Sequence, residues 1–195
     1  MKLDELFRLL AEARRICGHS DYVVIGSNAA LAFAGSTRLP DDMVMSVDVD
    51  CYTRDDPGRI FDLVKELGED SRHHQSTGIF LDAVSPALPT LPDGWRDRLI
   101  MLEQGACRAW FLDPNDAAIS KYARGDVKDL RWIRSGIAAG ILSLPTIRMR
   151  AGRTTFADAQ EKDRVITQIE IDSHWFDNAR SAAAGVAGEI EIFKR

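Results

Sequence analysis

The spacing of apolar residues changes along the first quarter of the chain, and each spacing predicts a different element. Between residues 2 and 17, apolar side chains recur every three or four positions, which is typical of a helix with one buried stripe, and Gly18 ends it. The apolar run 22–25 is too short for a helix and stops at Gly26. We therefore expect a buried strand that leads into a turn at Gly26.

The segment after this turn changes from helical to strand-like spacing. Ser27 or Asn28 is suited to cap a helix of small residues that ends at Gly35, and a turn-rich loop covers residues 36–43. Residues 44–53 contain a pattern with a period of two, which predicts a strand. This alternation places Val47, Val49 and Cys51 on one face and Asp48, Asp50 and Tyr52 on the other.

The remaining patterns predict two further strand regions and then helices. We expect a helix from Asp56 to Leu67, with Ile60, Phe61, Val64 and Leu67 on its apolar side, and then a polar loop at 69–77. A strand within 78–84, a proline-rich ordered loop at 85–95 and a hairpin within 98–112 around Gln104-Gly105 follow. Helices are expected at 114–125, at 126–140 and from Asp158 to about Arg180, the last with Val165, Ile169 and Trp175 on its apolar side, before a frayed tail. This order predicts an α+β domain with a mixed sheet flanked by helices. We assign residues 1–112 to the sheet-bearing core and residues 113–195 to a helical C-terminal region packed on it as one unit.

Composition narrows the class of protein without naming a function. A chain of 195 residues with 45% hydrophobic and 28% charged residues is typical of a soluble globular protein. It contains no apolar run of the roughly 18 residues that a membrane span needs, so we expect no membrane partner and a cytoplasmic location. The three cysteines are widely spaced and form no CxxC pair, which favours reduced thiols over disulfides or a zinc site.

Charge is distributed unevenly along the chain. The net charge of −5 argues against a protein coated for non-specific binding to nucleic acid. However, residues 121–153 contain eight basic and two acidic residues, so this stretch carries +6 and the remainder −11. The sequence therefore predicts a basic surface on an acidic body.

Two carboxylates on one face of a strand need an explanation. The α-carbons of Asp48 and Asp50 are expected about 6 to 7 Å apart, so their charges repel each other. A divalent cation between them removes this repulsion, and Mg²⁺ prefers oxygen ligands. Asp82, which follows three apolar residues on another predicted strand, is suited to complete the site. The alternatives are a solvated strand face for Asp48 and Asp50, and a simple strand end for Asp82.

The Gly26-Ser27 turn is the second candidate feature. A glycine lets the backbone approach a phosphate, and the amides at the start of the next helix offer hydrogen-bond donors. The spacing of "GSNAALAFAG" does not match the G-x-G-x-x-G pattern of dinucleotide-binding proteins. The alternative interpretation is a strand-to-helix turn with an ordinary helix cap.

These motifs, in this order, resemble those of a known superfamily. The Gly26-Ser27 turn, the strand "VDVDCY" and the aspartate in "IFLDAV" are similar to the DNA polymerase β-type nucleotidyltransferases in their minimal prokaryotic form. The segments "GIFLDAVSPALPTLPDGWRDRL" and "FLDPNDAAISKYARGDVKDLRWI" resemble a bacterial branch related to AbiE-type abortive-infection toxins. Together these segments cover residues 20–142. One departure is that Ser46 is separated from Asp48 by Val47, whereas superfamily members often place serine directly before the first aspartate.

The resemblance implies a role for each of these residues. Asp48, Asp50 and Asp82 would be catalytic and bind Mg²⁺, as one or two ions with Mn²⁺ as a substitute, and Asp82 would also help to deprotonate the acceptor hydroxyl. Gly26, Ser27 and Lys121 would contact the nucleoside triphosphate (NTP). Arg124 and Lys128 are further candidates for contact with phosphate or nucleic acid. The alternatives are capping or pairing on a helix surface for Lys121 and a solvated face for Arg124 and Lys128.

The expected function is transfer of a nucleoside monophosphate from an NTP to an acceptor hydroxyl. RNA, and tRNA in particular, is favoured as the acceptor, with a protein or a small molecule as alternatives, and the resemblance suggests a toxin-antitoxin component with an antitoxin or regulator partner. A catalytically idle binding module and a metal-dependent phosphohydrolase are the competing hypotheses. We interpret His73-His74 as solvated loop residues and the four tryptophans as packing residues.

Overall fold

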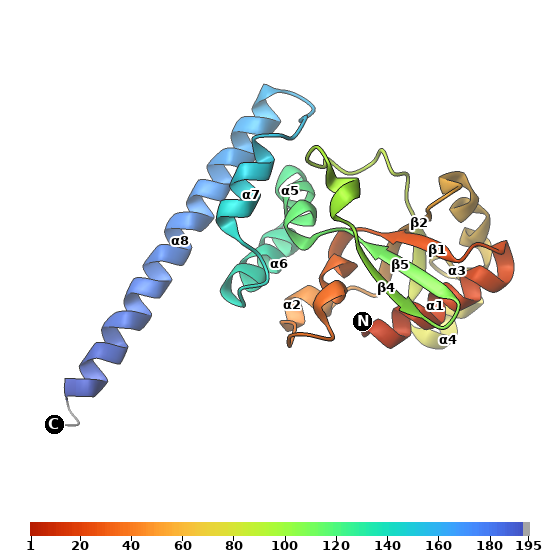
Figure 1. Ribbon diagram of the computed structural model, residues 1–195, viewed down its shortest axis with the longest axis horizontal. Helices are drawn as coiled ribbons and strands as arrows, with labels where there is room; N and C mark the ends of the chain where they lie inside the picture. The colour runs from red at the N-terminus through yellow and green to blue at the C-terminus, as the bar shows by residue number, and fades with distance from the viewer. Residues whose placement is uncertain (193–195) are drawn as a thin grey trace.

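The computed structural model describes the backbone of residues 1–192 and the side chains of residues 1–181. Five strands form one mixed sheet in the order β3-β2-β1-β5-β4 (Figure 1). The strands are β1 (Asp21–Val24), β2 (Asp48–Thr53), β3 (Phe80–Ala83), β4 (Ile100–Gln104) and β5 (Cys107–Phe111). β1 is antiparallel to β2 and parallel to β5, whereas β2 is parallel to β3 and β4 is antiparallel to β5. The predicted α+β class and mixed sheet are confirmed.

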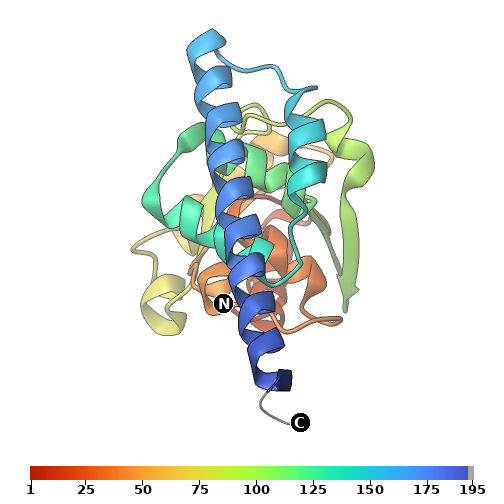
Figure 2. The ribbon, with the colours of Figure 1, turned by 90° about the vertical axis from the view of Figure 1, so that its left-hand side faces the viewer.

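Helices flank the sheet and form the C-terminal part of the molecule. They are α1 (Leu3–Cys17), α2 (Asp41–Val44), α3 (Val64–Leu67), α4 (Arg72–Thr77), α5 (Pro114–Arg124), α6 (Val127–Ala138), α7 (Leu144–Ala151) and α8 (Ala159–Ile192), with the 3₁₀ helices η1 (Gly26–Phe33), η2 (Pro57–Leu63) and η3 (Trp95–Arg98). The long helix α8 runs beside α7, away from the sheet (Figures 1 and 2). Within the described residues, no helix is both long and apolar enough to cross a membrane.

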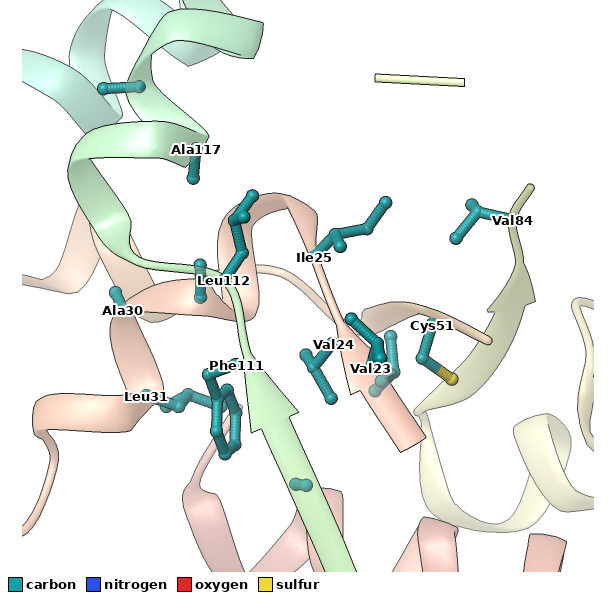
Figure 3. Close-up of a cluster of buried hydrophobic side chains, with 14 of the residues drawn as sticks. Val23, Val24, Ile25, Ala30, Leu31, Cys51, Val84, Phe111, Leu112 and Ala117 are labelled. Atoms are coloured by element: carbon teal, nitrogen blue, oxygen red, sulfur yellow. The ribbon is translucent and has the colours of Figure 1, made fainter. Parts of the chain in front are cut away.

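The two faces of the sheet differ in chemistry. Because directly paired residues share a face, Tyr22 and Val24 of β1 lie on the same face as Cys51 of β2 and Phe111 of β5. This face is fully buried and joins the core, part of which is drawn in Figure 3. The opposite face carries Asp48, Asp50 and Tyr52 of β2 and the paired Asp82 of β3. The predicted alternation along β2 is therefore present and gathers the three aspartates on one face, called the polar face below, which also carries Val23, Phe80 and Trp110.

The segment from Asp56 to Leu67 forms a 3₁₀ helix followed by one α-helical turn, and not a continuous α-helix. A 3₁₀ helix has three residues per turn, so Ile60 and Leu63 align and are both fully buried. The predicted apolar side is wrong at Phe61 and Val64, whose exposed fractions are 51% and 43%. The 3.6-residue period placed these two residues on the buried side because it does not apply to this segment.

Other boundaries also differ from the predictions. The helix after Gly26 is a 3₁₀ helix, the predicted loops at 36–43 and 69–77 contain α2 and α4, and α7 was not predicted. His73 and His74 consequently lie on a short helix. β2 begins at Asp48, which leaves Val47 exposed. The helix α8 extends to Ile192 through most of the predicted frayed tail, of which residues 193–195 lie outside the described residues.

Candidate functional site

Three carboxylates converge on the polar face of the sheet. Asp50 of β2 is directly paired with Asp82 of β3, and Asp48 lies two residues earlier on the same strand face. Each of the three offers a carboxylate oxygen, and these oxygens lie within 4.8 Å of one another. The register between two parallel strands thus brings together residues that are more than thirty positions apart in the sequence.

The electrostatics of this cluster are unfavourable without a cation. Burial, followed by the charges of Asp48 and Asp82, raises the pKa of Asp50 to about 7, against the opposing effect of Lys121 and Arg124. Burial and the charge of Asp48 also raise the pKa of the more exposed Asp82. Three carboxylate oxygens at this spacing repel one another, and a Mg²⁺ or Mn²⁺ ion bound between them would remove this repulsion.

The Gly26 turn is packed directly against Asp50. The backbone amide of Ile25 donates a hydrogen bond to the carbonyl oxygen of Asp50 over 2.9 Å. Gly26 has a φ of +66°, and a Cβ atom built on it would lie 1.9 Å from Oδ2 of Asp50. Both the backbone conformation and the close approach of the carboxylate therefore require glycine at this position.

Asn28 supports the carboxylate strand from the same turn. It is fully buried, and its Nδ2 donates to the carbonyl oxygen of Asp48 over 2.6 Å. The sequence indicated Asn28 only as a helix cap. Asn28 lies in η1 facing β2, and its hydrogen bond connects the Gly26-Ser27 turn to the backbone of Asp48, a candidate metal ligand.

Ser27 is held on both of its oxygen atoms by the C-terminal helices. Lys121 Nζ of α5 donates to Ser27 Oγ over 2.9 Å, and Trp132 Nε1 of α6 donates to its carbonyl oxygen over 3.2 Å. Lys121 is only 3% exposed, so the alternative of a pairing on the helix surface is wrong. Because Lys121 donates to Oγ, the hydroxyl hydrogen of Ser27 remains free to donate to a ligand.

Asp129 is a central residue of the site to which the sequence assigned no role. It is 1% exposed and accepts hydrogen bonds from Lys121 over 2.9 Å and from Arg124 over 2.6 Å. Burial raises the pKa of Asp129, but the hydrogen bonds from Arg124 and Lys121 outweigh it and hold the pKa below its usual value. Arg124 is thus anchored and is not simply a solvated residue, whereas Lys128 is exposed.

Two pockets flank the carboxylates. The first has a volume of about 200 Å³, and its lining includes Ser27, Ser46, Lys128, Arg131 and Trp132. The second has a volume of about 350 Å³, and its lining includes Gly26, Asp50, Leu88, Pro89, Arg124 and Glu161. The second pocket is lined by Asp50, whereas the first adjoins the aspartates only through Ser46, whose Oγ donates to Oδ1 of Asp48 over 2.5 Å. A larger pocket of about 520 Å³ between α7 and α8 shares no lining residue with either. The two smaller pockets are therefore separate spaces, one lined by Asp50 and the other next to Asp48.

Most basic residues of the stretch 121–153 are paired with carboxylates. Five of its eight basic residues pair with carboxylates: Lys121, Arg124, Arg134, Arg148 and Arg150. Lys128, Arg131 and Arg153 form no ion pair with the residues whose side chains are described. Three basic residues of the stretch are thus left without a carboxylate partner in the described part of the chain, and two of them line the Ser27 pocket.

Comparison with known proteins gives a family. A family model described as "Nucleotidyltransferase of unknown function (DUF6036)" matches residues 4–182, which is most of the chain. Neither the search of curated proteins nor the search of solved structures found a match. The matched region contains the three aspartates, the Gly26-Ser27 turn and the Lys121–Asp129 pair.

Proposed function

Because the chain belongs to this family of nucleotidyltransferases, we propose that it is a metal-dependent enzyme that transfers a nucleoside monophosphate from an NTP to an acceptor hydroxyl and releases pyrophosphate. The observation that carries the proposal is the convergence of Asp48, Asp50 and Asp82 beside the Gly26-Ser27 turn. Phosphoryl transfer needs little covalent help from a protein, and such a site supplies what it does need, which is positioning and charge neutralisation.

Each residue of the cluster has a proposed role. Asp48 and Asp50 hold Mg²⁺, or Mn²⁺ in its place, and Asp82 completes the ligand set. Bound metal neutralises charge on the attacking and leaving oxygens. Asp82 is the most exposed carboxylate and has a raised pKa, so it is the residue suited to accept the proton of the acceptor hydroxyl.

The two pockets suggest how the substrates are arranged. The Ser27 pocket combines a free hydroxyl hydrogen with the exposed cations Lys128 and Arg131. Asp42 and Asp129 also line it, but both already accept hydrogen bonds within the protein, so the cations are left to bind a triphosphate. Lys121 acts by positioning Ser27 and not by direct contact with the NTP. The pocket at Gly26 and Asp50 is then left for the acceptor, with Arg124 at its margin.

The acceptor that we propose is RNA, with tRNA as the favoured class. The support is the sequence resemblance to toxin-related nucleotidyltransferases, together with the three basic residues of the stretch that remain unpaired in the described part of the chain. A role in a toxin-antitoxin pair, with an antitoxin or regulator as partner, rests on the same resemblance.

The direct test is incubation of the protein with Mg²⁺, each α-labelled NTP and total RNA. We expect labelled RNA and released pyrophosphate with the wild type, and a loss of at least about a thousandfold in rate with Asp48→Asn combined with Asp50→Asn. Release of orthophosphate without labelled product would favour a phosphohydrolase. Absence of transfer with every NTP, together with absence of Mg²⁺ and NTP binding by calorimetry, would refute the proposal.

A second candidate is a catalytically idle binding module. The observation that favours it is the internal pairing of Lys121 and Arg124 with Asp129, which occupies cations beside the site. This hypothesis expects the double variant Asp48→Ala, Asp50→Ala to keep its cellular activity. It also expects Arg131→Glu, at a residue with no ion pair in the described part of the chain, to abolish partner binding.

A further inference from the structure

A third pocket lies on the polar face of the sheet, beyond the carboxylates. It has a volume of about 210 Å³, and its lining includes Val23, Tyr52, Arg54, Pro86, Arg96 and Leu99. Tyr52 follows Asp50 by two residues on β2, so its side chain shares the face of the aspartates about 7 Å further along the strand. The pocket is therefore close to the candidate metal site but contains none of its residues.

Two arginines in this pocket are held in place by aromatic rings. The Arg54 guanidinium carbon lies 3.8 Å from the ring centroid of Trp110, and that of Arg96 lies 4.5 Å from the ring centroid of Trp95. The backbone of Arg54 is also fixed, because its amide donates to the carbonyl oxygen of Asp21. Stacking leaves the edge of a guanidinium free for bidentate hydrogen bonds to an oxyanion.

These arginines lack the carboxylate partners that most arginines of the C-terminal helices have. Neither Arg54 nor Arg96 lies within ion-pair distance of a carboxylate in the part of the chain with described side chains. The nearby carboxylate of Asp21 is already engaged by Arg108 over 2.5 Å and by Trp110 Nε1 over 3.0 Å. The pocket thus presents to solvent two arginines that have no ion-pair partner among the described side chains.

Tyr52 supplies a third polar group to the pocket. Its side chain is 4% exposed, and its hydroxyl forms no hydrogen bond with any residue whose side chain is described, yet it is not one of the fully buried polar atoms that lack a partner. The hydroxyl is therefore open to the pocket and available to donate a hydrogen bond to a ligand. Since Tyr52 lines the pocket with Arg54 and Arg96, a bound oxyanion would satisfy all three groups.

We infer that Tyr52, Arg54 and Arg96 form a binding site for a phosphate group of the acceptor substrate. The assignment to the acceptor rests on the proposed function and on the direction of β2. Ser46, in the pocket assigned to the triphosphate, precedes Asp48, whereas Tyr52 and Arg54 follow Asp50. The strand β2, from Asp48 to Thr53, lies between these residues and alone spans about 17 Å, so one triphosphate does not reach both pockets. The acceptor is therefore a phosphate-bearing molecule whose hydroxyl lies at Asp50 and Asp82.

Binding is tested with inorganic phosphate as the probe. Nitrogen-15 NMR of the full chain follows the Nε–H signals of Arg54 and Arg96 and the indole signals of Trp95 and Trp110. We expect saturable shifts in the wild type and unchanged affinity in Ser27→Ala, because Ser27 lies in the other pocket. Arg54→Gln and Arg96→Gln should each weaken the affinity by about tenfold or more, and Tyr52→Phe, which keeps the packing, by a few fold. Arg15→Gln, at an exposed arginine of α1, is the matched control and should bind as the wild type.

Linear, non-saturating shifts in the wild type would overturn the site. Wild-type affinity in both Arg54→Gln and Tyr52→Phe would overturn it as well. The assignment to the acceptor is tested separately in the transfer assay with total RNA, where Arg96→Gln should raise the KM for RNA and leave the KM for the NTP unchanged. A raised KM for the NTP alone would contradict that assignment. If the wild type does not bind NTP, the proposed function is refuted. The phosphate titration still tests the site formed by Tyr52, Arg54 and Arg96 in that case.

Discussion

At the scale of single residues, the contact between Gly26 and Asp50 connects backbone conformation to metal binding. Gly26 adopts a left-handed conformation, and the Asp50 carboxylate occupies the space in which a Cβ atom would lie. The Gly-Ser pair is often described as a phosphate-binding element, for which the glycine gives the backbone access to the ligand. In this protein the glycine also makes room for a metal ligand, so the two halves of the site depend on one residue.

The first prediction concerns the substitution Gly26→Ala. The new methyl group must displace the Asp50 side chain, and the positive φ adds strain of about 1 to 3 kcal/mol. We expect the affinity for Mn²⁺, measured by calorimetry, to fall by at least about tenfold while the circular dichroism spectrum stays that of a folded protein. Gly78→Ala is the matched control, because Gly78 has a φ of +74° with no atom within 4 Å of the added Cβ. Equal metal affinity in the two variants would contradict this role of Gly26.

The second prediction concerns the pH dependence caused by Asp50. Burial and the neighbouring aspartates raise its pKa to about 7 in the folded protein, from 3.8 in the unfolded chain. Between these two values the folded state binds more protons than the unfolded state, so the free energy of unfolding falls as the pH rises from about 4 to about 7. Asp50→Asn removes this loss. In EDTA, we expect the variant to melt higher than the wild type by at least roughly 2–4 °C at pH 8 and at the same temperature near pH 4.

Thermal melting across this pH range, with and without Mg²⁺, measures the effect. Added Mg²⁺ should raise the melting temperature of the wild type at pH 8 more than that of Asp50→Asn, because the ion neutralises the Asp50 carboxylate as the proton does at lower pH. A difference between the two proteins that is the same at pH 4 and pH 8 would show that Asp50 titrates normally.

At the scale of elements, the sequence predicted what depends on local periodicity. The alternation along β2 placed Asp48 and Asp50 on one face, and the apolar run before Asp82 identified β3 as a strand. The sequence thus predicted the two strands that carry the aspartates, and the parallel pairing of β2 with β3 brings the three carboxylates together. Asp129 was not identified as part of the site, because its contacts with Lys121 depend on how α5 and α6 pack beside η1 and not on any local pattern.

In the segment from Asp56 to Leu67, local periodicity gave the wrong helix type. Its apolar residues fit a 3.6-residue period well enough to predict an α-helix, yet the chain forms a 3₁₀ helix that buries Leu63 and exposes Phe61. The helix type is decided by how the segment packs against α1 and β2, so propensity alone gives the element but not its buried side. The sequence likewise assigned no role to Tyr52 and Arg54, the residues that we propose bind phosphate, although their spacing continues that of Asp48 and Asp50.

The third prediction concerns the buried pair of Lys121 and Asp129. Removing one partner leaves the other buried and less compensated, so Lys121→Met and Asp129→Asn should each lower the free energy of unfolding by about 3 kcal/mol. The double variant removes both buried charges, and the loss of the Arg124–Asp129 pair is already present in Asp129→Asn, so the total loss should be smaller than the sum of the single losses by about 1 to 2 kcal/mol. Urea denaturation of the four proteins measures this coupling. The exposed pair Arg15–Glu12 is the control cycle, with an expected coupling below about 0.5 kcal/mol, and equal coupling in the two cycles would contradict the role of burial.

At the scale of the whole molecule, buried carboxylates join the C-terminal helices to one another and to the sheet-bearing core. Asp116 of α5 is fully buried and pairs with Arg98 of η3 and with Arg150 of α7. Asp172 of α8 is also fully buried and accepts hydrogen bonds from Tyr122 of α5 and Arg134 of α6. The basic residues of the stretch 121–153 therefore serve mainly to hold helices together, and α5 is the element that both groups of contacts share.

The fourth prediction is that the core and the helical region unfold as one unit. The helix α5 buries Ala118 and Ile119, its Lys121 contacts η1, and its Tyr122 contacts α8, so neither region keeps its packing when the other unfolds. Asp172→Ala leaves Arg134 and the Tyr122 hydroxyl without their partner and should cost about 3 kcal/mol. Differential scanning calorimetry should then show a single transition that moves as a whole to lower temperature, with equal calorimetric and van't Hoff enthalpies. If the two regions were independent domains, the wild type would show two transitions and the substitution would move only one of them, because Asp172 contacts the C-terminal helices alone.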